Sequence, residues 1–84
     1  MRRDKQLEEL IDLLLSIKTK EDMKNFLLGI FTPKELQEIP TRLHIVKMLR
    51  SGVSQHKIAQ DLKVGIATVT RGSRELQMGR FRVV

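Results

Sequence analysis

Apolar residues recur at intervals of three and four along most of this 84-residue chain, and no stretch alternates steadily between apolar and polar residues. The spacing is clearest near the start of the chain. This pattern is typical of amphipathic helices, whereas a half-buried strand requires a period of two. The sequence therefore predicts an all-α fold. One stripe of its first helix consists of Leu7, Leu10, Ile11, Leu14 and Ile17.

Short polar patterns mark where further helices begin. The clearest is Thr32-Pro33-Lys34-Glu35, in which threonine caps a helix, proline takes its first position and glutamate its third. This third helix continues towards Arg50, and Pro40 inside it predicts a kink near Thr41 and Arg42, or a break. Its apolar positions are Leu36, Ile39, Leu43, Val46 and Leu49. Other helices are expected to begin after Thr19, Ser54 and Gly65, which makes five in all.

Positive charge is concentrated in the second half of the chain. Residues 1–40 contain seven basic and eight acidic side chains, whereas residues 41–84 contain nine basic ones and only two acidic ones. The whole chain has a net charge of +6. This distribution favours a polyanionic partner, with nucleic acid ahead of an anionic membrane.

A helical chain of this size buries little apolar surface by itself. It has no cysteine, so neither disulfides nor a thiolate metal site can stabilise it, and its two histidines, His44 and His56, do not indicate a metal site. Leu13 and Leu15 also widen the apolar surface of the first helix beyond one face. We therefore expect a homodimer and no metal. The expected interface side chains are Leu7, Leu10, Leu14, Phe26 and Leu27.

No apolar run approaches the roughly 20 residues of a membrane span, and no signal-peptide pattern opens the chain. A membrane-surface anchor over Met1–Ile17 is disfavoured because its acidic side chains would repel anionic lipid. We expect no membrane partner and a cytoplasmic location. A single domain over residues 1–84 is predicted, with dimerisation helices in 1–31, a central helix in 32–52, a helix-turn-helix in 54–78 and a tail in 79–84.

Residues 55–74 have the spacing of a DNA-binding helix-turn-helix, in which a short helix, a tight turn and a second helix follow each other. Lys63 lies in the turn, where a positive φ is expected. Ile58, Leu62, Val64 and Val69 are apolar where the pair must pack on the third helix. The short side chains of the second helix allow close approach to base edges in a major groove. The expected DNA contacts are Gln55, His56, Lys57, Gly65, Ile66, Ala67, Thr68, Thr70, Arg71 and Arg74.

Residues 31–76 resemble the bacterial tryptophan repressor family. The resemblance rests on Phe31-Thr32-Pro33, on Thr41-Arg42 and above all on the stretch GIATVTRGS at residues 65–73. A related family of repressor-like proteins without a known amino-acid ligand shares the arginine of the third helix but not Thr-Arg-Gly-Ser. The resemblance implies an intertwined homodimer of five-helix Trp repressor-like subunits.

The resemblance also implies that L-tryptophan binds as a corepressor between the third helix and the second helix of the helix-turn-helix, called the reading helix because it would contact base edges. Arg42 matches the arginine that stacks on the indole, Arg71 the arginine that pairs with the carboxylate, and Gly72 the glycine that gives the indole room. Thr32 matches a cap threonine near the carboxylate. The carbonyls that accept from the ammonium group would be those of Gly29 and Phe31.

The chain departs from the family pattern in several places. Glu75 replaces a serine near the ligand ammonium, where it would either serve that cation or pair with Arg71. Pro40 replaces a small residue beside the pocket arginine. No counterpart of the family's last helix lies within these 84 residues, so Phe81 and Val83 either substitute weakly for it or belong to a disordered tail.

We predict a sequence-specific DNA-binding transcriptional repressor that acts as a homodimer on double-stranded operator DNA, with L-tryptophan as corepressor. A ligand-independent repressor of the same fold is one alternative. A helical module whose basic face binds an acidic partner protein is another. No catalytic residues are expected, because the serines and histidines form no nucleophile–base pattern and no glycine-rich loop could hold a phosphate.

Overall fold

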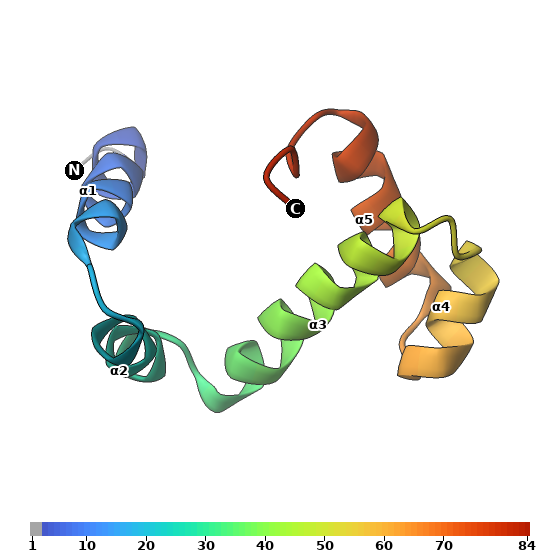
Figure 1. Ribbon diagram of the computed structural model, residues 1–84, viewed down its shortest axis with the longest axis horizontal. Helices are drawn as coiled ribbons and strands as arrows, with labels where there is room; N and C mark the ends of the chain where they lie inside the picture. Colours follow the sequence, from blue (N-terminus) through green and yellow to red (C-terminus); the bar gives the residue numbers. More distant parts are fainter. Residues whose placement is uncertain (1–2) are drawn as a thin grey trace. The chain divides into compact units, whose positions relative to one another are not determined.

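The computed structural model describes residues 3–84, and this part of the chain contains five helices and no strand (Figure 1). The predicted all-α fold is confirmed. Met1 and Arg2, which open the predicted dimerisation segment 1–31, lie outside the described residues. The helices are α1 (Arg3–Ser16), α2 (Lys20–Ile30), α3 (Pro33–Arg50), α4 (Gln55–Leu62) and α5 (Ile66–Gln77).

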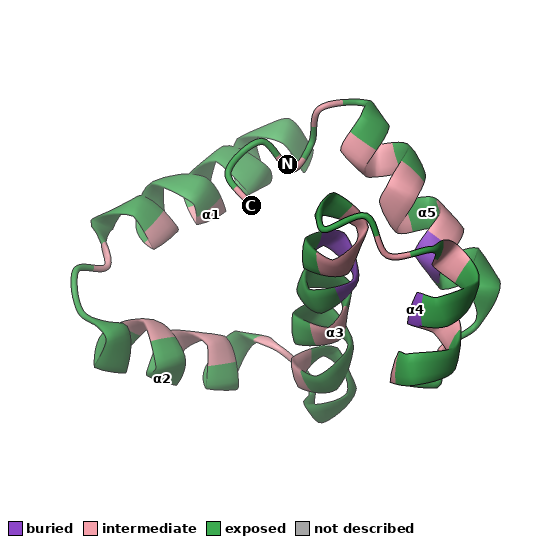
Figure 2. Cartoon of the chain, turned by 45° about the vertical axis from the view of Figure 1, so that its right-hand side comes forward, coloured by how far each residue is buried: buried purple, intermediate pink, exposed green. Residues whose placement is uncertain are grey.

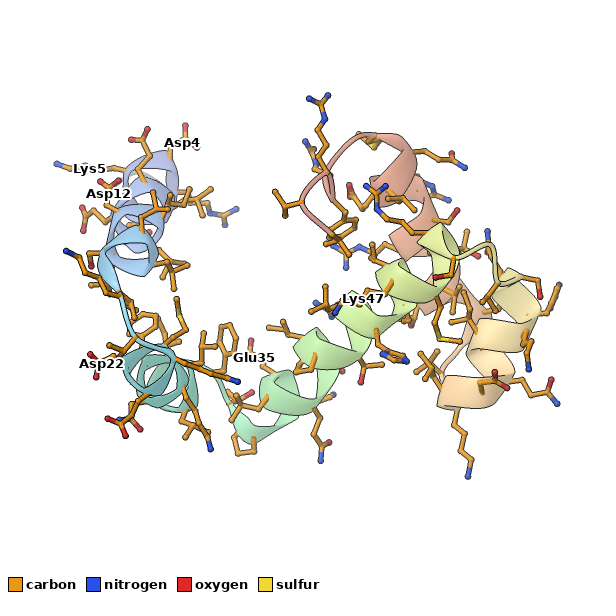
Figure 3. All side chains as sticks on the ribbon, in the orientation of Figure 1. Asp4, Lys5, Asp12, Asp22, Glu35 and Lys47 are labelled. Atoms are coloured by element: carbon orange, nitrogen blue, oxygen red, sulfur yellow. The ribbon has the colours of Figure 1, made fainter. Side chains whose placement is uncertain are left out.

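Three of these helices begin with the capping bonds that the sequence predicts. Thr19 Oγ1 accepts from the N–H of Asp22 at 3.1 Å before α2, and Ser54 caps α4 in the same way. Before α3 the bonds are reciprocal. The N–H of Thr32 donates to Glu35 Oε1 at 2.9 Å, and the N–H of Glu35 donates to Thr32 Oγ1 at 3.2 Å (Figure 3 labels Glu35). These bonds satisfy N–H groups that lack a partner inside the helix, so they define where each helix begins.

The α3 helix runs without a break through Pro40, so the break considered from the sequence does not occur. Proline has no N–H to donate to the preceding turn. Next to it, the Thr41 hydroxyl donates to the carbonyl of Gln37 at 2.8 Å. A threonine bonded to the preceding turn in this way bends a helix slightly without ending it.

Gly52 lies just beyond the end of α3, as predicted. Its φ is +86°, and its N–H donates to the carbonyl of Leu49 at 3.0 Å, while the N–H of Val53 donates to the carbonyl of Met48 at 3.1 Å. This pair of bonds is a Schellman motif, which needs a residue in the left-handed conformation. Glycine adopts it without steric cost.

The chain forms two compact units, and the boundary between them in the sequence lies between Leu36 and Gln37. The buried core belongs to the second unit, where α3, α4 and α5 carry the buried positions (Figure 2). Packing of the helix-turn-helix on α3 is confirmed, because Ile58 and Val69 share one cluster with Ile45. The fully buried side chains are Ile45, Val46, Ile58 and Val69, each at most 1% exposed.

Two apolar positions of α3 remain on the surface of the single chain. Ile39 and Leu43 belong to the stripe predicted for this helix, but both are exposed. Ile45, which that stripe does not include, is buried instead. The helical spacing alone therefore identified only part of the side that α4 and α5 cover.

The first unit has no buried residue in α1 or α2 (Figure 2). Several of its leucines and isoleucines are exposed in the single chain and the others are partly buried; Leu15 is 78% exposed. An amphipathic helix with an uncovered apolar side is stable only when another surface packs on it. A shallow apolar hollow on this unit is lined by Lys20, Met23, Lys24, Leu27, Leu28 and Leu36.

The polar side of α1 and α2 carries acidic side chains. Asp4, Asp12 and Asp22 are exposed and extend away from their helices (Figure 3). Among the described residues, no helix has the length and apolar character needed to cross a membrane.

Candidate nucleic-acid interface and ligand pocket

The turn between α4 and α5 has the geometry of a helix-turn-helix. Lys63 lies in the left-handed region, with φ +56° and ψ +47°, as the sequence predicts for this position. Its N–H donates to the carbonyl of Ala59, and the N–H of Val64 donates to the same carbonyl at 3.1 Å. Both turn N–H groups therefore bond to the carbonyl of Ala59 in the last turn of α4, and the chain continues into α5.

The first turn of α5 exposes small side chains and backbone donors. Gly65 caps this helix with extended backbone and without a side-chain hydrogen bond. Ile66 is 43% exposed, and Ala67 and Thr68 are exposed as well. A helix start without a side-chain cap presents N–H groups that suit a phosphate, and short side chains leave room for it. This end of α5 is the strongest candidate for contact with a nucleic acid.

A hydrogen bond joins two of the predicted DNA-contacting residues to each other. The Thr70 hydroxyl donates to Gln55 Oε1 at 2.8 Å, in a partly buried position between α4 and α5. The bond leaves the amide N–H groups of Gln55 available as donors, whereas the Thr70 hydroxyl is already engaged. No sequence pattern indicated this contact, because the two residues are 15 positions apart.

Several basic side chains lie around this region. His56, Lys57, Arg71 and Arg74 are all exposed. Lys57 Nζ lies 3.1 Å from Asp61 Oδ2, one helical turn further along α4, and both side chains are well exposed. Exposed ion pairs contribute little and are screened by salt, so this pair leaves Lys57 free to exchange its partner for a phosphate.

A hollow between α3 and α5 brings together Arg42, Arg71, Gly72 and Glu75, which the resemblance assigns to the ligand. It measures about 390 Å³ when the space open to solvent is counted. Exposed guanidinium groups at such a site suit a carboxylate and an aromatic face. The full lining is Arg42, Ile45, Val46, Thr68, Arg71, Gly72, Glu75 and Phe81.

Gly72 lets α5 approach α3 closely at this hollow. A Cβ atom at Gly72 would lie 3.3 Å from Cγ2 of Ile45 and 3.8 Å from Cδ1 of Leu49. The shorter distance is below the usual separation of about 3.5–4.0 Å between carbon atoms. Any larger residue would force the buried Ile45 side chain to move.

Glu75 pairs with Arg80 rather than with Arg71. Arg80 Nε lies 3.4 Å from Glu75 Oε2, without the geometry of a hydrogen bond. Glu75 Oε2 is enclosed and has no hydrogen-bond donor within the described chain. An enclosed carboxylate oxygen without a donor is costly, so Oε2 can still accept a hydrogen bond although the Arg80 guanidinium lies beside it.

Three of the predicted ligand residues belong to the first unit. Gly29 and Thr32 are exposed, and Phe31 is partly buried. The Thr32 hydroxyl already accepts from the N–H of Glu35, and the N–H of Phe31 donates to Leu27. The roles of Gly29, Phe31 and Thr32 towards a ligand stay a prediction.

Phe81 lines the hollow, although the sequence did not identify it as part of this site. It was expected to substitute for a missing helix or to lie in a disordered tail. In the structure the tail forms turns, and Phe81 is partly buried at the hollow. Only its tertiary position reveals this, since the six residues after Met78 contain no recognisable motif.

The family model described as Trp repressor protein matches residues 5–82. The chain belongs to the Trp repressor family. Among similar proteins, "Uncharacterized protein YerC" of Bacillus subtilis is 35% identical over 77 residues, which cover 92% of this chain and 74% of that protein. A "Trp operon repressor homolog" of Vibrio cholerae is 38% identical over 71 residues, covering 83% of this chain and 69% of that protein.

A "Trp operon repressor homolog" of Xylella fastidiosa is 35% identical over 78 residues, which cover 92% of this chain and 85% of that protein. No solved structure matches the chain significantly. The Trp repressor family consists of DNA-binding regulators, so the chain is a DNA-binding regulator and not an enzyme. The described residues contain no group of side chains that could hold a metal ion.

Proposed function

We propose that this protein is a homodimeric, sequence-specific transcriptional repressor that binds operator DNA in the cytoplasm with L-tryptophan as its corepressor. The observation that carries the proposal is that two parts of α5 suit two different partners. Its exposed first turn suits a major groove, and its next turns line the hollow that contains Arg71, Gly72 and Glu75. A ligand in that hollow would therefore contact the same helix that contacts DNA.

On the DNA side, Ile66, Ala67 and Thr68 would meet base edges. Their methyl groups suit thymine, and the Thr68 hydroxyl suits a base or a phosphate. The uncapped helix start at Gly65 would face a phosphate. Residues 41–84 carry nine basic against two acidic side chains, which supports attraction to the DNA backbone. The phosphate contacts would come from Gln55, His56, Lys57, Arg71 and Arg74, with Thr70 holding Gln55 in place.

Dimerisation would cover the exposed apolar side chains of α1 and α2. A single chain leaves them in water, and a second copy offers the same surface in a symmetric interface. Two reading helices that enter successive major grooves would lie about 34–36 Å apart on a palindromic site.

On the ligand side, Arg42 would stack on the indole, and Arg71 would pair with the carboxylate. Glu75 Oε2 is enclosed and without a hydrogen-bond donor, which supports a role as acceptor for the ammonium group. The carbonyls of Gly29 and Phe31 and the hydroxyl of Thr32 are the further proposed contacts. A bound amino acid of this kind would brace α5 against α3 and shift the pair towards one pose.

DNA binding is tested by selecting from a random-duplex pool with the purified protein and measuring affinity across a range of salt concentrations. Thr68→Ala should relax the selected sequence, whereas Lys57→Ala should weaken all sequences alike and reduce the salt slope. Lys47→Ala is the matched charge control. Lys47 is exposed and lies on the side of α3 away from Ile45, because two residues turn a helix by about 200°.

Enrichment of no sequence, together with salt-independent affinity for duplex, would refute DNA readout. Those results would instead favour the module that binds an acidic partner protein. Sedimentation of the same preparation tests the dimer, and a folded monomer at micromolar concentration would contradict it.

Corepressor binding can be followed by the fluorescence of L-tryptophan, because the chain itself contains no tryptophan or tyrosine. Arg71→Ala removes a charge-assisted hydrogen bond worth about 1.5–3 kcal/mol, so affinity should fall at least tenfold. Arg74→Ala should leave it unchanged, since Arg74 is on the same helix but outside the lining of the hollow.

Glu75 has its own ligand test. Glu75→Ser should weaken L-tryptophan binding but not the binding of indole-3-propionate, which lacks the ammonium group. Stronger binding of L-tryptophan to the serine variant would mean that Glu75 obstructs the pocket instead. No binding of either ligand to any variant, with DNA affinity unchanged by L-tryptophan, would leave a ligand-independent repressor.

A further inference from the structure

The chain reverses direction immediately after α5 (Figure 1). Gly79 has φ +85°, its N–H donates to the carbonyl of Leu76 at 3.1 Å, and the N–H of Arg80 donates to the carbonyl of Glu75 at 3.1 Å. This second Schellman motif returns the tail towards the helices it has just left. The residues that follow therefore lie beside the hollow between α3 and α5.

Three contacts hold the returning tail. Arg50 Nη2 donates to the carbonyl of Phe81 at 2.7 Å, which connects the tail to the last turn of α3. Arg80 Nε lies 3.4 Å from Glu75 Oε2, which connects it to α5. The N–H of Val84 donates to the carbonyl of Phe81 at 3.1 Å and closes the turn. Contacts to both helices fix the segment on either side of Phe81.

Phe81 differs from the residues next to it in its surroundings. Arg80 and Arg82 are exposed, and Val83 is 98% exposed, whereas Phe81 is partly buried and lines the hollow. It shares that hollow with Arg42, Arg71 and Gly72. An aromatic ring is the class of group that two guanidinium groups and a glycine-floored hollow accommodate well.

We propose that Phe81, tethered at the wall of this hollow, restricts it, so that the docked tail and a free aromatic amino acid exclude each other. The inference rests on the proposed corepressor site and adds its regulation. Phe81 lines the hollow, so its ring narrows the space that an indole needs, and the ion pair of Arg80 engages the carboxylate proposed for the ligand ammonium. A free ligand binds only when the tail undocks.

The tail has a large advantage over a free ligand because it is attached close to the site. A short tether gives an effective concentration on the order of millimolar. The apparent dissociation constant of the free ligand rises by the inverse of the fraction of molecules with an open hollow. A tail docked in most molecules therefore weakens L-tryptophan binding about threefold to tenfold.

The test titrates L-tryptophan into the unaltered 84-residue protein and three variants, with the indole fluorescence of the ligand as the signal. Phe81→Ala should bind about threefold to tenfold more tightly than the unaltered protein. Arg50→Met keeps the Phe81 ring but removes the donor to the Phe81 carbonyl, so it should also bind L-tryptophan more tightly than the unaltered protein. This variant provides the test if Phe81→Ala does not fold. Val83→Ala is the matched control on the same tail and should bind like the unaltered protein.

Docking itself has a readout that needs no ligand. Phe81→Trp places the only indole of the protein at the hollow, and its emission should be protected from iodide quenching. Adding Arg50→Met to that variant should increase quenching. Quenching equal to that of free tryptophan in both would overturn the docked tail.

The outcomes separate the two proposals. Equal or weaker binding by Phe81→Ala, with clear binding by the unaltered protein, would overturn the exclusion and leave the corepressor site intact. Absence of binding by the unaltered protein and by Phe81→Ala alike would overturn the corepressor site and the exclusion together. Binding by Phe81→Ala alone would support both.

Discussion

Replacing Lys63 with glycine should stabilise this protein. Lys63 is the one non-glycine residue with positive φ among the described residues, at φ +56° and ψ +47° in the turn between α4 and α5. Side chains with a Cβ incur a steric cost in this conformation, and glycine does not. The substitution acts on the backbone alone, because the lysine side chain has no ion-pair partner in the described chain.

The expected gain is the difference between two opposing effects. Left-handed backbone costs an L-residue about 1–2 kcal/mol. Glycine makes the unfolded chain more flexible, which costs about 0.4–1 kcal/mol. The net stabilisation should be about 0.5–1 kcal/mol, which corresponds to an increase in Tm of about 2–8 °C for a domain of this size.

Thermal and urea denaturation, followed by circular dichroism at one fixed protein concentration, measure this gain. The concentration must be fixed because the stability of the proposed dimer would depend on it. Lys63→Ala is the control, since it removes the charge but keeps the Cβ and should leave stability nearly unchanged. A glycine variant that melts at or below the alanine variant would refute the reasoning.

Gly52→Ala should have the opposite effect and lower the free energy of unfolding by about 0.5–1 kcal/mol in a urea titration. Gly52 has φ +86°, so a Cβ there would be strained by the backbone, although it would meet no other atom within 4 Å. A gain in stability would contradict this prediction. Ile58→Ala should lower it by about 2–5 kcal/mol, since the side chain is fully buried; a loss near zero would show that the core is assigned wrongly. Thr32→Ala should lower it by about 1 kcal/mol by removing the acceptor for the N–H of Glu35, and Thr32→Ser should restore most of that loss.

The helix starts could be predicted from the sequence because each depends on a few neighbouring residues. Thr19, Thr32 and Ser54 bond to N–H groups three positions further on, so the pattern and the contact coincide. The positive φ of Lys63 followed in the same way from the length of the turn. The resemblance of the GIATVTRGS stretch to a known family was equally local.

The sequence did not determine which apolar residues α3 buries. Helical spacing favoured Ile39 and Leu43, which are exposed in the single chain, and it did not include Ile45, which is buried. A helix with apolar residues on several sides does not specify which side its neighbours cover. That choice depends on where α4 and α5 pack.

The pocket shows the same division between local and tertiary information. Arg42, Arg71, Gly72 and Glu75 were predicted together, and the structure places them around one hollow. Phe81 joins them only because Gly79 reverses the chain and Arg50, 31 residues earlier, holds its carbonyl. Residue types and short spacings thus determined the helices, their caps and the class of partner. Contacts between distant residues, whose energies depend on the packed arrangement of three helices, decided that Phe81 lines the site.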